Sequence, residues 1–209
     1  MATVTTQNLI IETAIKLFNE HGTKAVSTNR IADVCSISRG LLHYHFKNKE
    51  DIIQTIFSRI DQEMDNDWYD DHKHPNIKYA RFMFERQIEL ILRYSFFYRE
   101  LYPLLRKDEK LKTHFRLSRK KRETEVRSFF DELIRAGLMV QPKAPASLDS
   151  LLRISWLISD QWLLHLELTG VEADATSIRE GFSLIYQGFE PFFTPEALAE
   201  YQASLTVSG

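Results

Sequence analysis

The sequence is poor in residues that interrupt or cross-link a chain. Its 209 residues include one cysteine, Cys35, so no disulfide can form within the chain, and a reducing cytoplasm is the expected location. Glycine and proline are scarce, with seven and six residues, and no stretch alternates apolar and polar residues as a half-exposed strand would. The scarcity of chain breakers predicts an all-α fold.

Long apolar runs are missing as well. Asp160 interrupts the longest candidate, residues 154–168, so we expect no membrane span. The first twelve residues lack the basic and apolar regions of a secretion signal. No glycine-rich phosphate loop or nucleophile elbow occurs, so we expect no enzyme, no cofactor and no metal. His72 and His74 are a weak metal candidate, and a solvated loop is the favoured interpretation.

The charge is small in total but unevenly distributed. The net charge is −2, which is unusual for a protein that binds an anionic partner. Residues 1–50 hold six basic and four acidic side chains, whereas residues 140–209 hold three basic and nine acidic ones. This polarity is typical of a DNA-proximal head and a distal body.

Residues 27–49 have the pattern of two short helices around a tight turn. Ser27 and Ser38 are candidate N-caps, because each side-chain oxygen can accept from a free amide of the first helical turn. Leu42 and Phe46 share one face at i, i+4 spacing, which predicts that they anchor the second helix to a small core.

The other face of this second helix points outward. Arg39, His43 and Tyr44 lie on it, where they can reach base edges and phosphates. A short helix held by a few apolar residues, with such groups exposed, has the properties of a recognition helix.

Residues 7–57 resemble the N-terminal helix-turn-helix of the TetR family of bacterial transcriptional regulators. Three positions differ from the usual family pattern: Ser36 replaces Gly, Leu41 replaces Thr or Ser, and His43 replaces Tyr. Leu41 loses a hydroxyl but can touch a thymine methyl group. The matching signature is Ile31-Ala32, Ser38-Arg39-Gly40, His43-Tyr44-His45-Phe46 and Lys49-Glu50.

The resemblance implies a DNA-binding domain at residues 1–50 and a helical ligand-binding and dimerisation domain at residues 51–209. It implies three partners: a double-stranded DNA operator, a second copy of the chain, and a largely apolar small-molecule effector. Arg39 is expected to read bases and Lys49 to hold a phosphate. The implied DNA-binding residues are Ser27, Thr28, Asn29, Ser38, Arg39, Gly40, Leu41, His43, Tyr44 and Lys49.

Aromatic residues gather just before the middle of the chain, with five between residues 94 and 102. Core and dimer packing, or the wall of an apolar ligand cavity, explain them about equally well. The candidate ligand-binding residues are Phe84, Tyr94, Phe97, Tyr98, Tyr102, Phe115, Trp156, Asp160 and Trp162.

Residues 106–122 carry nine basic and two acidic side chains. A second DNA contact or a site for an anionic ligand such as an acyl-CoA is one interpretation. A solvated helix face is the favoured one.

Two late helices, at residues 148–169 and 175–193, are predicted to form a four-helix interface with a second copy. The first is apolar nearly all round, so it must be buried on most sides. Asp160 and His165 within it need polar partners, and pairing inside the structure is favoured over lining a cavity. The candidate interface residues are Leu152, Leu163, Leu166, Gly181, Leu184, Ile185, Gly188 and Phe192.

The predicted function is therefore that of a dimeric, ligand-responsive transcriptional regulator, most simply a repressor on a palindromic operator. An activator, or a regulator that responds to a protein partner, would use the same head. An all-α ligand-binding or enzymatic module whose head no longer binds DNA is the alternative from another class.

Overall fold

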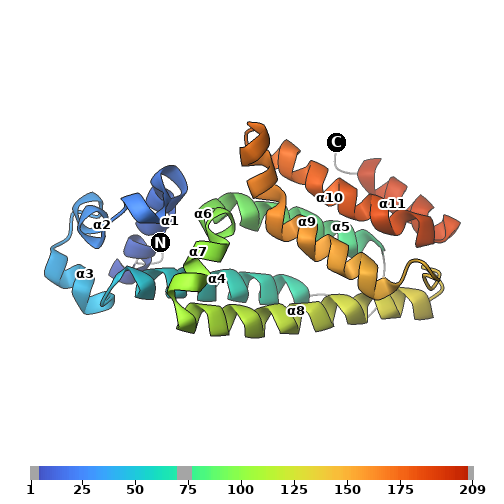
Figure 1. Ribbon diagram of the computed structural model, residues 1–209, viewed down its shortest axis with the longest axis horizontal. Coiled ribbons are helices and arrows are strands. Elements are labelled where there is room, and N and C mark those ends of the chain that lie inside the picture. The colour runs from blue at the N-terminus through green and yellow to red at the C-terminus, as the bar shows by residue number, and fades with distance from the viewer. Residues whose placement is uncertain (1–4, 70–76, 207–209) are drawn as a thin grey trace. The chain divides into compact units, whose positions relative to one another are not determined.

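A computed structural model describes residues 5–69 and 77–206, and helices dominate both ranges (Figure 1). The described residues contain no strand, only an isolated bridge between Met139 and Phe193, which confirms the all-α prediction. The helices are α1 (Thr6–Ala25), α2 (Thr28–Val34), α3 (Arg39–His45), α4 (Lys49–Tyr69), α5 (Ile77–Arg93), α6 (Ser95–Arg99), α7 (Leu101–Lys107), α8 (Glu109–Arg135), α9 (Leu148–Thr169), α10 (Ala175–Phe189), the short 3-10 helix η1 (Glu190–Phe192) and α11 (Pro195–Thr206).

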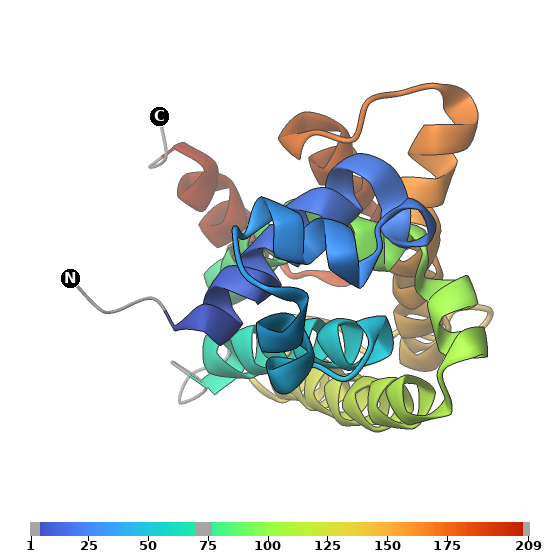
Figure 2. The same cartoon turned by 90° about the vertical axis from the view of Figure 1, so that its left-hand side faces the viewer.

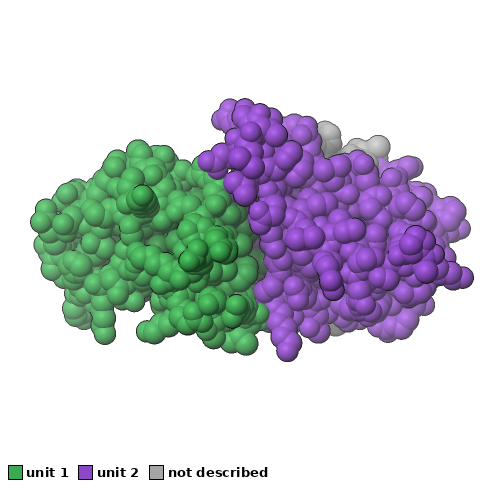
Figure 3. Space-filling model, in the orientation of Figure 1, with its two compact units in different colours: residues 1–64, 93–118 green, residues 65–92, 119–209 purple. Residues whose placement is uncertain are grey.

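The chain divides into two compact units, shown in separate colours in Figure 3. Unit 1 comprises residues 1–64 and 93–118, and unit 2 comprises residues 65–92 and 119–209. Each unit therefore combines two separate stretches of sequence. The predicted boundary at residue 50 divides the chain by function and not by contacts, and it stays a prediction.

Unit 1 contains the three-helix group α1–α3, coloured blue in Figure 2. Ile10, Ala14 and Phe18 recur at helical spacing on α1, and all three are fully buried. Gly22 interrupts α1 with a φ of 75° and a ψ of 158°, a left-handed φ that glycine adopts without a steric penalty. One further helical turn follows it, which extends α1 to Ala25.

The rest of unit 1 packs around aromatic rings. Phe57 of α4 stacks on Phe97 of α6 at 5.2 Å between ring centroids and also meets Phe115 of α8 at 5.7 Å. These rings bring the first part of α8 alongside α4, as Figures 1 and 2 both show. The aromatic stretch after residue 93 thus contributes to the core of the unit that carries the head.

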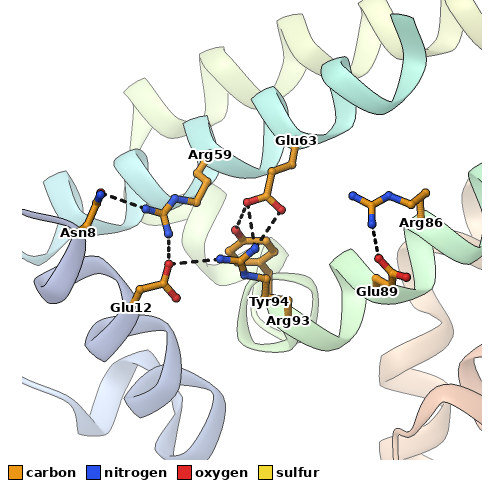
Figure 4. Close-up of polar contacts among 8 residues, drawn as sticks. All are labelled: Asn8, Glu12, Arg59, Glu63, Arg86, Glu89, Arg93 and Tyr94. Carbon is orange, nitrogen blue, oxygen red and sulfur yellow. Dashed lines mark hydrogen bonds and ion pairs between the residues drawn. The ribbon is translucent and has the colours of Figure 1, made fainter. Parts of the chain in front are cut away.

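A polar network joins α1, α4 and the end of α5 within unit 1 (Figure 4). Arg59 donates to Glu12, and Arg93 lies between Glu12, at 3.2 Å, and Glu63, at 3.3 Å. The hydroxyl of Tyr94 donates to Glu63 at 2.7 Å. Burial, followed by this hydrogen bond, raises the pKa of Tyr94 well above its usual range, so the ring stays a neutral donor.

Unit 2 is built on the close pair α9 and α10. Both helices begin with a capping box, formed by Ser147 with Ser150 and by Asp174 with Ser177, and α9 ends at Gly170 with a φ of 72°. None of the described helices combines the length and the apolar character needed to cross a lipid bilayer. His72 and His74 lie outside the described residues.

Candidate nucleic-acid interface

The two short helices of the head begin as their serines predict. Ser27 accepts a hydrogen bond from the amide of Arg30 at 3.2 Å, and Ser38 accepts one from the amide of Leu41 at 3.1 Å. Each hydroxyl uses a lone pair for this contact, so its proton remains available for donation to a phosphate oxygen. The caps are therefore compatible with the predicted phosphate contacts.

The turn between α2 and α3 is tight and unusual. Ser36 has a φ of 54°, in the left-handed region that favours glycine, and the amide of Ile37 donates to the carbonyl of Ala32 at 3.1 Å. Glycine is the usual family residue at position 36, and the geometry explains why: it adopts this conformation without a steric penalty.

Helix α3 separates a buried face from an exposed one. Leu42 is fully buried and Phe46, just after the helix, is 3% exposed. Tyr44 is 83% exposed, and its ring meets His45 edge to face at 5.3 Å. The structure thus brings the predicted contact residues of α3 to one solvent-facing surface. Those residues are Arg39, Gly40, Leu41, His43 and Tyr44.

The N-terminal end of α2 supplies three more of the predicted contacts. Ser27 and Asn29 are exposed and Thr28 is half-buried at its N-terminal end. Arg30, which the motif does not single out, is exposed beside them, and its guanidinium lies 2.8 Å from Nε2 of His21. In the sequence, only the position of Arg30 in the first turn of α2 indicates that it could contact DNA.

Lys49 differs from the other predicted contacts. Its Nζ donates to the carbonyls of Thr23, at 2.5 Å, and Val26, at 2.9 Å. Burial, followed by the charge of Lys107, lowers its pKa, while Glu50 acts in the opposite direction. The side chain is thus committed to the backbone that follows Gly22, and its phosphate contact stays a prediction.

The candidate ligand-binding residues fall in two groups. In unit 1, Tyr94 and Phe97 are fully buried, and Tyr98 packs edge-on against Phe97. The ring of Phe97 stacks on Phe57, and Phe115 contacts the same Phe57 ring. Tyr102 is 71% exposed beneath the guanidinium of Arg106, so it does not line an enclosed cavity. The role of Tyr102 in ligand binding stays a prediction.

In unit 2, the candidates make well-defined polar contacts. Asp160 accepts two hydrogen bonds from Arg119, at 2.9 and 2.6 Å, and that guanidinium lies 4.0 Å from the ring centre of Trp156. Trp162 donates to the carbonyl of Ser177 at 2.8 Å. The favoured interpretation of Asp160, pairing within the structure, agrees with these contacts. Phe84, in α5, packs against Phe182 at 5.3 Å.

Most of the basic stretch 106–122 is paired. Lys107 binds Glu50 at 2.6 Å, Lys112 binds Glu109 at 2.8 Å, and other cations of the stretch bind acidic partners. These pairs neutralise much of the local charge, in agreement with a solvated and ion-paired helix face.

The predicted dimer face requires correction. The structure buries five of the eight candidates inside the protomer, so they cannot form its outer surface. Gly181 is one of them. A Cβ built on it would lie 2.7 Å from the ring of Trp162, so this glycine allows the close approach of α9 in the same chain. Leu184 and Gly188 remain exposed, and Phe192 is half-buried. The five buried residues are Leu152, Leu163, Leu166, Gly181 and Ile185.

An exposed apolar row lies on another side of α9. Ile154, Leu157, Leu164 and Leu168 recur at three-, seven- and four-residue spacing, which places them on one helix face, and between 44% and 78% of each is exposed. We call this row the α9 stripe. Four large apolar side chains in one exposed row are typical of a surface that another protein covers.

Comparison with known proteins identifies the family. Residues 10–56 match the family model described as bacterial regulatory proteins, tetR family, and residues 59–201 match one described as a bacterial transcriptional repressor. A TetR-family transcriptional regulator from Marinobacter aquaeolei VT8, of known structure, is 27% identical, with a TM-score of 0.82 and coverage of 97% of both chains.

Two other proteins show how far the likeness extends. The probable acrEF/envCD operon repressor of Escherichia coli K12 is 36% identical over 52 residues, which is 25% of this chain and 24% of that protein. The chain thus matches less than a third of the length of its curated relatives. The SmeT–triclosan complex has a TM-score of 0.62 at 15% identity, covers 91% of this chain and 92% of its own, and shows a shared fold alone.

Both family models together span nearly the whole chain, and the head has the geometry that the first of them requires. Members of this family are transcription factors and not enzymes. The chain belongs to the TetR family of bacterial transcriptional regulators.

Proposed function

We propose that this protein is a cytoplasmic repressor that binds a palindromic operator as a homodimer and releases it when a small, largely apolar molecule binds. The observation that carries the proposal is the exposed face of α3, on which Arg39 and Tyr44 project while Leu42 anchors the helix. Two such helices, related by a two-fold axis, would enter major grooves about 34–36 Å apart or a multiple of it.

The roles of the head residues follow from their chemistry. The guanidinium of Arg39 can form two hydrogen bonds with a guanine edge, and Leu41 can touch a thymine methyl group. Ser27, Thr28, Asn29 and His43 offer neutral donors for phosphates, which suits a head with little net charge. Lys49 can add a phosphate contact only with hydrogen-bonding capacity that its two carbonyl partners leave free.

The dimer is supported by the α9 stripe and by the exposed Leu184 of α10. An apolar face of this kind can close a two-fold interface on itself. The effector is supported by the many aromatic side chains of the body and by the SmeT–triclosan complex, which shares the fold. The effector would release DNA by preferring one spacing of the two heads over the other.

The first test is selection of duplexes from a randomised DNA library by the full-length protein, followed by titration of the enriched duplex. Arg39→Ala should weaken binding to that duplex by roughly 10- to 100-fold, since a bidentate base contact is worth about 1–3 kcal/mol. It should bind a scrambled duplex almost as the wild type does. Arg135→Ala, which removes the same charge from the exposed end of α8, is the matched control and should bind like the wild type.

Two results would contradict the proposal. Failure of the wild type to enrich any sequence would argue against operator binding. Equal losses by Arg39→Ala on enriched and scrambled duplexes would remove Arg39 from base reading. Native mass spectrometry of the same preparation tests the dimer and any retained effector, and a monomer would overturn the palindromic operator.

A further inference from the structure

The segment that joins α1 to α2 is held by two charged side chains from distant parts of unit 1. We call residues 22–27 the hinge segment. The amide of Thr23 donates to Oε1 of Glu100 at 2.9 Å, and its hydroxyl donates to Oε2 at 2.5 Å. On the other side, Nζ of Lys49 donates to the carbonyls of Thr23 and Val26.

These contacts satisfy backbone groups that the helices leave open. Gly22 breaks the hydrogen-bond pattern of α1, so the amide of Thr23 needs an acceptor from elsewhere, and Thr23 is only 7% exposed. The ammonium of Lys49 lies at the carbonyl end of α1, where a cation is favoured by the helix dipole. A Cβ at position 22 would lie 3.0 Å from Oε1 of Glu100, so a side chain there would displace this carboxylate by a few tenths of an ångström.

Glu100 itself occupies a rigid position. It forms the corner between α6 and α7, where its amide donates to Phe96 at 2.9 Å and its carbonyl accepts from Leu104 at 3.0 Å. The same corner is tied to α1 a second time, because Asn19 accepts from the amide of Phe96 at 2.9 Å. Arg99 also donates to the carbonyl of Asn19, at 2.7 Å.

The carboxylate therefore fixes the point at which the chain leaves α1 for α2. Within the hinge segment Val26 is extended, and Ser27, its last residue, caps α2. A change in the position of Thr23 shifts this cap and, through the tight turn at Ser36, the recognition helix α3. The family motif in residues 27–49 contains none of these hinge contacts except Lys49.

We propose that Glu100 is a positioning residue for operator recognition, which sets the placement of α2 and α3 by holding Thr23. The inference rests on the proposed function, because it concerns the same DNA contact. It assigns a role in DNA binding to a residue that lies 77 positions from its partner and outside the set of predicted DNA contacts.

Electrostatics and positioning predict opposite effects for Glu100→Ala. Removal of a carboxylate from a DNA-binding protein reduces repulsion of phosphates and should tighten binding to every duplex slightly. Loss of the Thr23 contacts should instead weaken binding to the enriched duplex by roughly tenfold, because α2 and α3 would no longer be held in the placement that fits its bases. Binding to a scrambled duplex should change less than about twofold.

The test uses the full-length protein and the duplex enriched by the wild type. Glu109→Ala is the matched control: it removes the same charge from an exposed position at the start of α8 in the same unit. A second matched pair probes the other partner. Thr23→Ser keeps both donors and should bind like the wild type, whereas Thr23→Val keeps the size but loses the hydroxyl and should bind more weakly.

Hydrogen exchange gives a readout that does not depend on DNA. In Glu100→Ala the amide of Thr23 should exchange at least about tenfold faster, while the amides of Ile31 and Leu42 keep their protection. Retained protection of these core amides also shows that the variant is folded. Glu100→Gln, which keeps the shape and one carbonyl acceptor, should fall between Glu100→Ala and the wild type in both measurements.

The outcomes separate the two proposals. If the wild type enriches a duplex but Glu100→Ala binds it as tightly as Glu109→Ala does, the positioning role is wrong and the proposed function stands. Unchanged exchange at Thr23 in Glu100→Ala would also overturn it. If the wild type enriches no duplex, both proposals fall.

Discussion

At the scale of single residues, Ser36 holds a conformation that its side chain disfavours. The left-handed conformation costs a residue with a Cβ about 1–2 kcal/mol, and glycine regains part of this despite its greater chain entropy. Ser36→Gly should therefore raise the free energy of unfolding by roughly 0.5–1 kcal/mol in urea denaturation. Ser36→Ala keeps the Cβ and should change it by less than about 0.5 kcal/mol. Equal effects of the two substitutions would argue that the turn is not strained.

Single residues were predictable where their partner lies close in sequence. The caps at Ser27 and Ser38 act within three residues, so their roles follow from local sequence. Asp160 was expected to need a partner, but Arg119 lies 41 residues away and meets it only through the packing of α8 on α9. The two carbonyl partners of Lys49 lie 26 and 23 positions away, so the sequence did not reveal them.

At the scale of helices, α9 and α10 approach closely at one point. The ring of Trp162 occupies the space above Gly181, so Gly181→Ala must push the two helices apart or reorient the ring. We expect a loss of about 1–3 kcal/mol in the free energy of unfolding, the usual cost of overpacking.

Gly188 provides a matched control on the same helix. A Cβ there meets nothing within 4 Å, so Gly188→Ala should stabilise the protein by roughly 0.5–1 kcal/mol through helix propensity. Chemical denaturation of both variants at one protein concentration measures the difference. A Gly181→Ala variant as stable as Gly188→Ala would show that Trp162 moves aside at no cost.

The same two helices show what periodicity can predict. Apolar residues around the whole of α9 indicated burial on nearly every side, and its ends agree with the predicted range. Periodicity does not reveal which apolar face meets the rest of the chain and which meets a partner. Leu152, Leu163 and Leu166 were therefore assigned to the dimer, although they pack inside the protomer and the α9 stripe is the exposed row.

At the scale of the whole molecule, the α9 stripe should control the oligomeric state. Leu164→Glu and Leu168→Glu place a carboxylate in an apolar row, where burial against a partner would leave it unpaired. Sedimentation should show monomers at concentrations where the wild type is dimeric. Leu117→Glu, at a leucine of α8 that is 66% exposed, should remain dimeric. If all three variants behave alike, the stripe is not the interface.

The assembly of the compact units was the least predictable feature. The all-α class and the helix-turn-helix followed from local patterns, since breakers, caps and apolar spacing are all short-range signals. Unit 1 instead recruits residues 93–118 through contacts such as Phe57 with Phe97 and Asn19 with Phe96. Contacts over such separations depend on tertiary packing, which a single sequence does not encode in any local pattern.

The composition of unit 1 has a consequence for protein engineering. A chimeric regulator made by joining the first 50 residues of one family member to the body of another would cut this unit in two. The transplanted head would bring its own residue at position 23 but would meet a foreign corner between α6 and α7. Successful grafts should therefore exchange the α6–α7 corner together with the head, so that Thr23 keeps Glu100 and Asn19 keeps Phe96.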